Sequence, residues 1–172
     1  MDFGGPYRVA LVDDPERVEP CDGEIRRGDH ISASHVLSRS RTDHLRHAIR
    51  LCASGGGTSV HENSLLLDGD RALVACGAYL FALDLPSLRL EWATEVDWAS
   101  CFAVYKIGGD YLVHGELSIS RLSPDGNIRW QVQGRDIFTG PFSIDEGFVL
   151  AEDFDKNRYR IELASGRIED LQ

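Results

Sequence analysis

The sequence Tyr79-Leu80-Phe81-Ala82-Leu83-Asp84 is followed by Leu85-Pro86-Ser87 and Leu88-Arg89-Leu90-Glu91-Trp92. It predicts two strands joined by a turn, because short apolar runs are separated by Pro and Ser. A second copy follows as Leu117-Ser118-Ile119-Ser120-Arg121-Leu122, Ser123-Pro124-Asp125-Gly126 and Asn127-Ile128-Arg129-Trp130. Trp92 lies 38 positions before Trp130, and Gly77 lies 38 before Gly115. The chain therefore contains a repeat of about forty residues.

Three copies of this repeat are predicted, at about 63–96, 101–134 and 141–172. The third copy keeps the turns Asp145-Glu146-Gly147 and Ala164-Ser165-Gly166 but lacks the tryptophan. The pattern of each copy predicts an antiparallel meander of three or four short strands, which is the size of one β-propeller blade. Such a unit cannot bury both faces alone, so the copies are expected to stack on one another. Because Trp92 and Trp130 occupy equivalent positions, we expect them to pack between neighbouring sheets.

The stretch Leu80–Trp92 resembles the blade motif of quinoprotein (pyrroloquinoline-quinone-type) β-propellers, in which an apolar-Ala-Leu-Asp strand, a turn with Gly and a terminal Trp recur. The chain is also similar to short bacterial proteins that carry a few such repeats. The resemblance implies an all-β fold. Closed propellers have four to eight blades, the first copy lacks the turn Gly, and nothing marks a quinone site. We therefore expect a partial propeller or layered sheets, with no cofactor and no metal.

The first 57 residues predict an N-terminal strand, a long polar loop and a packing strand, joined to a repeat region at 58–172 in one structural domain. Tyr7–Val12 reads as a strand, and residues 13–41 are poor in apolar side chains and predict a loop. Leu45–Ala53 fits a helical face through Leu45, Ala48, Ile49 and Cys52, but it also fits strand alternation. We expect a strand there, because the neighbouring segments are all β.

The net charge of −10 is unevenly distributed. Residues 1–50 carry 9 acidic and 8 basic side chains, whereas residues 51–172 carry 19 and 10. Because phosphate binding draws on clusters of Lys and Arg, this balance disfavours nucleic acids and anionic membranes as partners. It favours a basic protein partner. Solubility alone would also explain the charge.

Cys21, Cys52, Cys76 and Cys101 are widely spaced and contain no zinc-ligand pair. Three of them lie in apolar runs, where a free thiol packs as a small hydrophobe. The sequence from Met1 has no signal-peptide pattern, and no apolar run is long enough to span a membrane. These features predict a cytoplasmic protein.

Two polar clusters in apolar surroundings are the candidate sites for chemistry. His114-Gly115-Glu116 occupies the turn equivalent to Cys76-Gly77-Ala78, and His61-Glu62 precedes the first strand of the first copy. A His beside a carboxylate can act as a general base, so a hydrolase using His61, Glu62, His114 or Glu116 is one hypothesis. The ordinary polarity of turns explains both clusters equally well.

Other motifs give little support for an enzyme. Ser54-Gly55-Gly56-Gly57 lacks the Lys and the helix of a phosphate loop, and Asp153-Phe154-Asp155 fails the calcium-loop pattern at its sixth and twelfth positions. No nucleophile elbow or cysteine-protease signature occurs. The sequence therefore favours a protein without catalytic activity.

The connectors between copies are the candidate binding surface. Trp98 lies between the first two copies, and Arg135 and Asp136 lie between the second and third. An exposed Trp beside charged residues is typical of a binding hot spot. We predict an interaction protein whose inter-repeat loops bind a protein partner, for example an immunity or inhibitor protein. The alternative is a binder of a small molecule or carbohydrate. Uncovered sheet edges also allow homo-oligomers.

Overall fold

A computed structural model describes residues 7–14, 16–41 and 46–171. Its described part contains sixteen strands and no helix, and the strands form four separate four-stranded sheets. The predicted all-β class is therefore confirmed. No described helix is long and apolar enough to cross a membrane.

The first sheet is built from the N-terminal segment. Its strands are β1 (Arg8–Asp13), β2 (Gly23–Arg27), β3 (Ala33–Ser40) and β4 (Arg46–Ala53), in the order β1-β3-β4-β2, with β2 parallel to β4. The predicted N-terminal strand and the strand over 46–53 are confirmed. Leu45, also part of that prediction, lies outside the described residues.

The predicted long loop over residues 13–41 is only partly correct, because β2 and β3 lie within it. The sequence of β3 looks polar, yet Ser34, His35 and Ser38 are buried along with Val36 and Leu37. Buried Asp14, which follows β1, accepts a hydrogen bond from Arg50 Nε of β4 at 2.9 Å. The polar side chains of β3 are thus core residues of this sheet.

The three sequence repeats form the other three sheets, each an antiparallel meander. The second sheet contains β5 (Leu65–Asp68), β6 (Arg71–Cys76), β7 (Tyr79–Asp84) and β8 (Arg89–Glu95). The third contains β9 (Cys101–Ile107), β10 (Asp110–Gly115), β11 (Ser118–Leu122) and β12 (Ile128–Gln133). The fourth contains β13 (Phe142–Asp145), β14 (Phe148–Glu152), β15 (Arg158–Glu162) and β16 (Ile168–Leu171). The repeat thus marks blade-like units.

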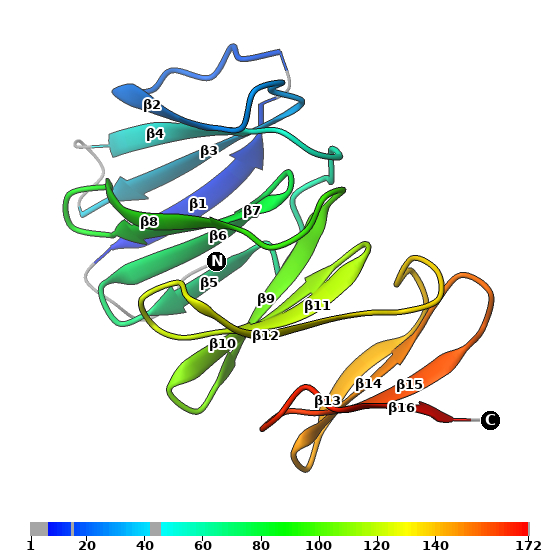
Figure 1. The fold of residues 1–172 in the computed structure, drawn as a ribbon. Helices are drawn as coiled ribbons and strands as arrows, with labels where there is room; N and C mark the ends of the chain where they lie inside the picture. The colour runs from blue at the N-terminus through cyan, green and yellow to red at the C-terminus, as the bar shows by residue number, and fades with distance from the viewer. Residues whose placement is uncertain (1–6, 15, 42–45, 172) are drawn as a thin grey trace.

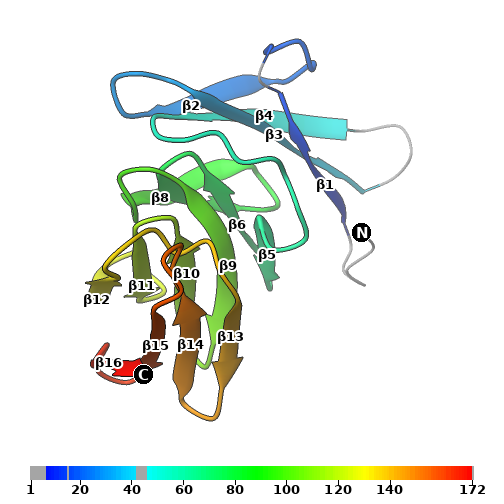
Figure 2. The same cartoon turned by 90° about the vertical axis from the view of Figure 1, so that its right-hand side faces the viewer.

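The four sheets follow one another along an open arc, with the first and fourth at its two ends (Figures 1 and 2). Three apolar clusters fill the spaces between successive sheets. The fully buried side chains Phe81, Tyr111 and Tyr159 belong to the first, second and third cluster respectively. The core is therefore a series of interfaces between layers, as expected of stacked repeats.

The two repeated tryptophans join neighbouring sheets, as predicted. Trp92 Nε1 donates to the carbonyl of Pro124 at 3.0 Å, and Trp130 Nε1 donates to the carbonyl of Leu163 at 2.9 Å. An arginine from the same sheet as each tryptophan donates to the same carbonyl: Arg71 to Pro124 at 2.9 Å and Arg121 to Leu163 at 2.7 Å.

Glycine at the next sheet's turn allows this close approach. A Cβ on Gly126, where φ is +80°, would lie 2.6 Å from the Trp92 ring. The corresponding turn of the second sheet has Leu88, which adopts φ 54° and is buried. Leu88 packs into the first apolar cluster together with Leu85. The absence of Gly from the first copy therefore marks an interface filled by leucines instead of a tryptophan.

Candidate functional site

The inter-repeat connectors gather along one edge of the arc, on the right-hand side of Figure 1. We call this edge the loop rim; it comprises residues 96–100, 115–117, 134–141 and 153–157. Backbone hydrogen bonds link its segments in sequence: Glu116 N to Ser100 O at 2.8 Å, Phe138 N to Glu116 O at 2.6 Å, and Phe154 N to Ile137 O at 2.9 Å. The loop rim is thus one continuous surface drawn from two sheets and their connectors.

Trp98 projects from the loop rim, with 80% of its surface exposed. The preceding residue, Asp97, is buried. Its carboxylate accepts backbone N–H groups from Ala99 at 2.7 Å, Leu117 at 2.9 Å and Ser118 at 2.8 Å. Burial raises the pKa of Asp97, against the effect of these donors. Because the carboxylate joins the connector to the neighbouring turn, the backbone that carries Trp98 is fixed.

Gly115 explains how that carboxylate fits. A Cβ at this position would lie 2.3 Å from Asp97 Oδ2. The glycine that marks the repeat in the sequence therefore gives space for the buried carboxylate beneath Trp98.

Phe154 is a second exposed aromatic side chain, with 65% of its surface exposed. It was not among the binding residues predicted from the sequence. It also follows a buried aspartate: Asp153 accepts hydrogen bonds from Tyr159 OH at 2.6 Å and Asn157 N at 2.9 Å. Burial alone would raise the pKa of Asp153, but these hydrogen bonds lower it overall. The recurrence of Asp-aromatic in the connectors and turns, as Asp97-Trp98 and Asp153-Phe154, was the sequence signal that could have identified it.

Charged side chains surround the two aromatic residues. The loop rim contains five acidic and two basic residues. Both basic residues are paired, Arg135 with Asp170 and Lys156 with Glu152. The Asp136 carboxylate accepts the N–H of Ile137 at 2.7 Å. Glu116 and Asp155 have no ion pair with another described residue. The free charge of the loop rim is thus negative.

The two His and Glu clusters do not form catalytic pairs among the described interactions. His114 Nε2 lies 3.2 Å from the carbonyl of Phe138, and its ring stacks on Phe142 with centroids 4.2 Å apart. Burial lowers the pKa of His114 to about 4, and the nearby His61 adds to this lowering. His114 is therefore neutral at pH 7. No described hydrogen bond connects His114 to Glu116, which lies two residues further along the chain on the loop rim.

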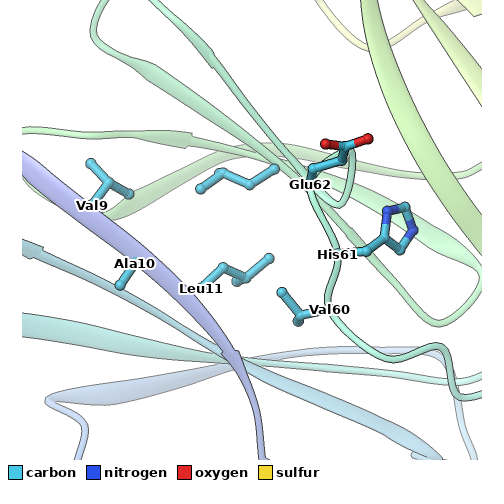
Figure 3. A pocket seen from close by; sticks show the side chains of 7 residues that line it. Val9, Ala10, Leu11, Val60, His61 and Glu62 are labelled. Carbon is cyan, nitrogen blue, oxygen red and sulfur yellow. The ribbon is translucent and has the colours of Figure 1, made fainter. Parts of the chain in front are cut away.

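His61 and Glu62 lie outside the loop rim, beside the first sheet, although His61 is still near enough to His114 to lower its pKa. His61 Nδ1 accepts the N–H of Asn63 at 3.3 Å, and Glu62 is exposed. Both line a pocket of about 150 Å³ against Val9 and Leu11 of β1 (Figure 3). The predicted site residues thus lie in three places. His61 and Glu62 line this pocket, and His114 packs between the third and fourth sheets. The loop rim contains the other four: Trp98, Glu116, Arg135 and Asp136.

The four cysteines are free thiols. Cys52, Cys76 and Cys101 are buried, as predicted, and burial raises the pKa of Cys76 to about 12. Within the described ranges, no three His, Cys, Asp or Glu side chains are grouped as the ligands of a metal ion would be.

No protein-family model matches this chain, and no curated protein does. Solved structures do resemble it. BamB from Moraxella catarrhalis has a TM-score of 0.58 at 17% identity, over 78% of this chain and 42% of that one. A europium-containing methanol dehydrogenase has a TM-score of 0.51 at 17% identity, over 66% and 25%. The AfRom2 CNH domain has a TM-score of 0.53 at 8% identity, over 95% and 54%.

These likenesses confirm the resemblance to quinoprotein-type β-propellers at the level of the fold. The chain spans only between a quarter and about half of those three proteins. Its four sheets form an open arc of propeller-like blades, and a fold of this kind is compatible with many functions.

Proposed function

We propose that this chain is a non-enzymatic protein-interaction module that binds a basic protein partner through the loop rim. The observation that carries the proposal is the exposure of Trp98 on a fixed backbone. Large aromatic side chains supply much of the binding energy at protein interfaces. A backbone already fixed in the free protein loses little entropy on binding.

Phe154 supports the same proposal. It repeats the arrangement of Trp98, an exposed ring following a buried, hydrogen-bonded aspartate, on the same edge of the arc. Two aromatic anchors joined by a continuous backbone network resemble the centre of an interface more than two isolated surface residues do.

The charge of the loop rim supports a basic partner. Arg135 and Lys156 are paired, whereas Glu116 and Asp155 remain available to cations. Complementary charge accelerates association and selects among partners. An immunity or inhibitor protein that covers a basic enzyme or toxin is the specific form of this proposal, and it is consistent with the small size and the net charge of −10.

Affinity capture from the native cell extract tests the proposal. Tagged wild-type protein would be compared with Trp98→Ala, Phe154→Ala and the control Val18→Ala, since Val18 is also highly exposed but lies outside the loop rim. We expect one stoichiometric basic protein, released at high salt and lost with either aromatic variant. Equal capture by Trp98→Ala and Val18→Ala would contradict the proposal. A folded monomer without any partner would favour the small-molecule alternative.

A further inference from the structure

One edge of the first sheet is open as far as the described strands show. Among these strands, β1 has a single neighbour, β3, in the order β1-β3-β4-β2. The N–H of Asp14 donates to Ser34 O at 2.8 Å, which continues the β1–β3 ladder. Residues two apart in an antiparallel pair point their backbone groups the same way. Ala10 and Val12 therefore bond to β3, whereas the N–H and C=O groups of Val9 and Leu11 point away from the sheet.

This edge differs from the other sheet edges. Along β9 the N–H of Val104 donates to the carbonyl of Asn63 at 3.0 Å, so that edge is partly covered. The edge strands β5 and β13 have only four residues each, and β8 and β2 contain charged residues. Charge, shortness and covering protect edges from pairing with other chains. The charged residues of β1 lie at its two ends, Arg8 and Asp13, and the Asp13 carboxylate accepts the N–H of Val60 at 3.0 Å. Between these ends β1 has only Val, Ala and Leu, so the edge at Val9 and Leu11 carries no charge.

An apolar pocket lies beside the open edge. Val9 and Leu11 of β1 line it together with Val60 (Figure 3), and Leu65 also contributes to its lining. Its volume of about 150 Å³ accommodates one aliphatic side chain. Glu62 lies at the rim of the pocket, is exposed, and has no ion pair with another described residue. The site thus combines free backbone groups, an apolar hollow and a negative charge.

We propose that β1 binds an extended segment of a partner protein as an additional strand, with one aliphatic side chain in the pocket and a basic side chain next to Glu62. Addition of a strand gains affinity from main-chain hydrogen bonds and specificity from pockets for alternate side chains. The basic character follows from Glu62, which is exposed and lines the pocket. This proposal uses a different surface from the loop rim and does not depend on it.

A synthetic peptide tests the site directly. The probe is acetyl-Lys-Val-Lys-Leu-Lys-Val-Lys-amide, whose length of about seven residues matches a strand of this size. The control peptide has Glu in place of every Lys. Binding is measured by the NMR signals and hydrogen exchange of individual backbone amides. We expect the amides of Val9 and Leu11 to exchange rapidly in the free protein and slowly with the Lys peptide, whereas that of Ala10 is protected in both.

Two variants separate the backbone from the charge. Leu11→Pro removes an N–H that points away from β3, so the β1–β3 ladder remains, and binding should weaken about fivefold. Leu11→Val keeps the N–H and serves as its control. Glu62→Lys leaves the strand untouched and should weaken binding of the Lys peptide about threefold. Trp98→Ala should leave peptide binding unchanged.

Four results would overturn the proposal. The first is slow exchange of Val9 and Leu11 in the free monomer, and the second is no change at these amides with the Lys peptide. The third is equal binding of the Lys and Glu peptides together with no effect of Glu62→Lys. Protection that depends on protein concentration in the absence of peptide would assign the edge to a second copy of the chain, and would also refute the proposal.

Discussion

The two edges of the arc use aromatic side chains in opposite ways. One edge, which we call the turn edge, contains the turns at Gly126 and Gly166. Here Trp92 and Trp130 donate their indole N–H groups to carbonyls of the next sheet and pack against these glycines. On the loop rim, Trp98 and Phe154 contact solvent, while the aspartates beside them are buried. Polar groups on the turn edge therefore join the sheets. On the loop rim, polar groups fix the backbone and leave the rings accessible.

This contrast separates the aromatic residues that stabilise the fold from those that we assign to binding. A ring that fills an interface between sheets contributes its buried area to folding. A ring in solvent contributes little to folding. Its presence on a fixed backbone therefore requires another explanation, and we propose that it binds a partner. Substitutions on the two edges should therefore have different consequences.

The largest effect is expected at the turn edge. Trp130→Ala removes an interface ring and its hydrogen bond to Leu163, and should lower the free energy of unfolding by about 3 kcal/mol. Urea unfolding of this variant and the wild type measures the loss. A loss below about 1 kcal/mol would show that this tryptophan does not join the third and fourth sheets.

A smaller effect is expected at the turn glycine. Gly126→Ala brings a methyl group within 2.6 Å of the Trp92 ring at a φ of +80°, and should cost about 2–3 kcal/mol. Gly108→Ala is the matched control: its φ is +58° but no atom lies within 4 Å of the added carbon. The control should cost about 1 kcal/mol, the conformational part alone. Equal losses, measured by thermal unfolding, would contradict the close packing.

His114 should make stability depend on pH. Burial lowers its pKa in the folded protein to about 4, from an ordinary value of 6.5. The unfolded chain therefore binds a proton first, so the contribution is complete above pH 6.5 and is lost as the pH falls toward 4. We expect a loss of about 2 kcal/mol across this window. His114→Gln keeps an N–H donor and should flatten the curve. An unchanged slope in urea unfolding at successive pH values would contradict the burial of this imidazole.

The smallest effect on stability is expected on the loop rim. Trp98→Ala should change the free energy of unfolding by less than about 0.5 kcal/mol, because the ring is 80% exposed. Thermal unfolding beside Trp130→Ala gives the comparison. A loss as large as that of Trp130→Ala would mean that Trp98 serves the fold, and it would remove the main reason for assigning the loop rim to binding.

The repeated part of the fold could be predicted from the sequence because its signals are local. Apolar runs separated by Gly, Asp and Pro located the three meanders, and the spacing of Trp92 and Trp130 identified them as interface residues. The first sheet was only half predicted. Burial of Ser34 and His35 in β3 rests on tertiary contacts that no local pattern reveals: Ser34 Oγ lies 3.6 Å from Cys52 Sγ, and His35 Nε2 lies 3.3 Å from the carbonyl of Thr58.

The candidate site was predicted in part. Trp98, Glu116, Arg135 and Asp136 do lie on one edge, because connectors of stacked meanders fall on the same side. The pairing of His61 or His114 with a neighbouring Glu was not found among the described interactions, since contact depends on which turn faces which sheet. Phe154 was missed because Asp153 was considered only as a calcium ligand, and its burial beside Tyr159 is a tertiary property.

Fluorescence quenching by acrylamide tests the central claim most directly, since Trp98 is the exposed one of the three tryptophans while Trp92 and Trp130 are partly buried. Wild-type protein and Trp98→Phe would be measured alone and with the captured partner. We predict an accessible component in the wild type that is absent from Trp98→Phe and disappears when the partner binds. An accessible component that the bound partner leaves unchanged would contradict the assignment of the loop rim as the binding surface.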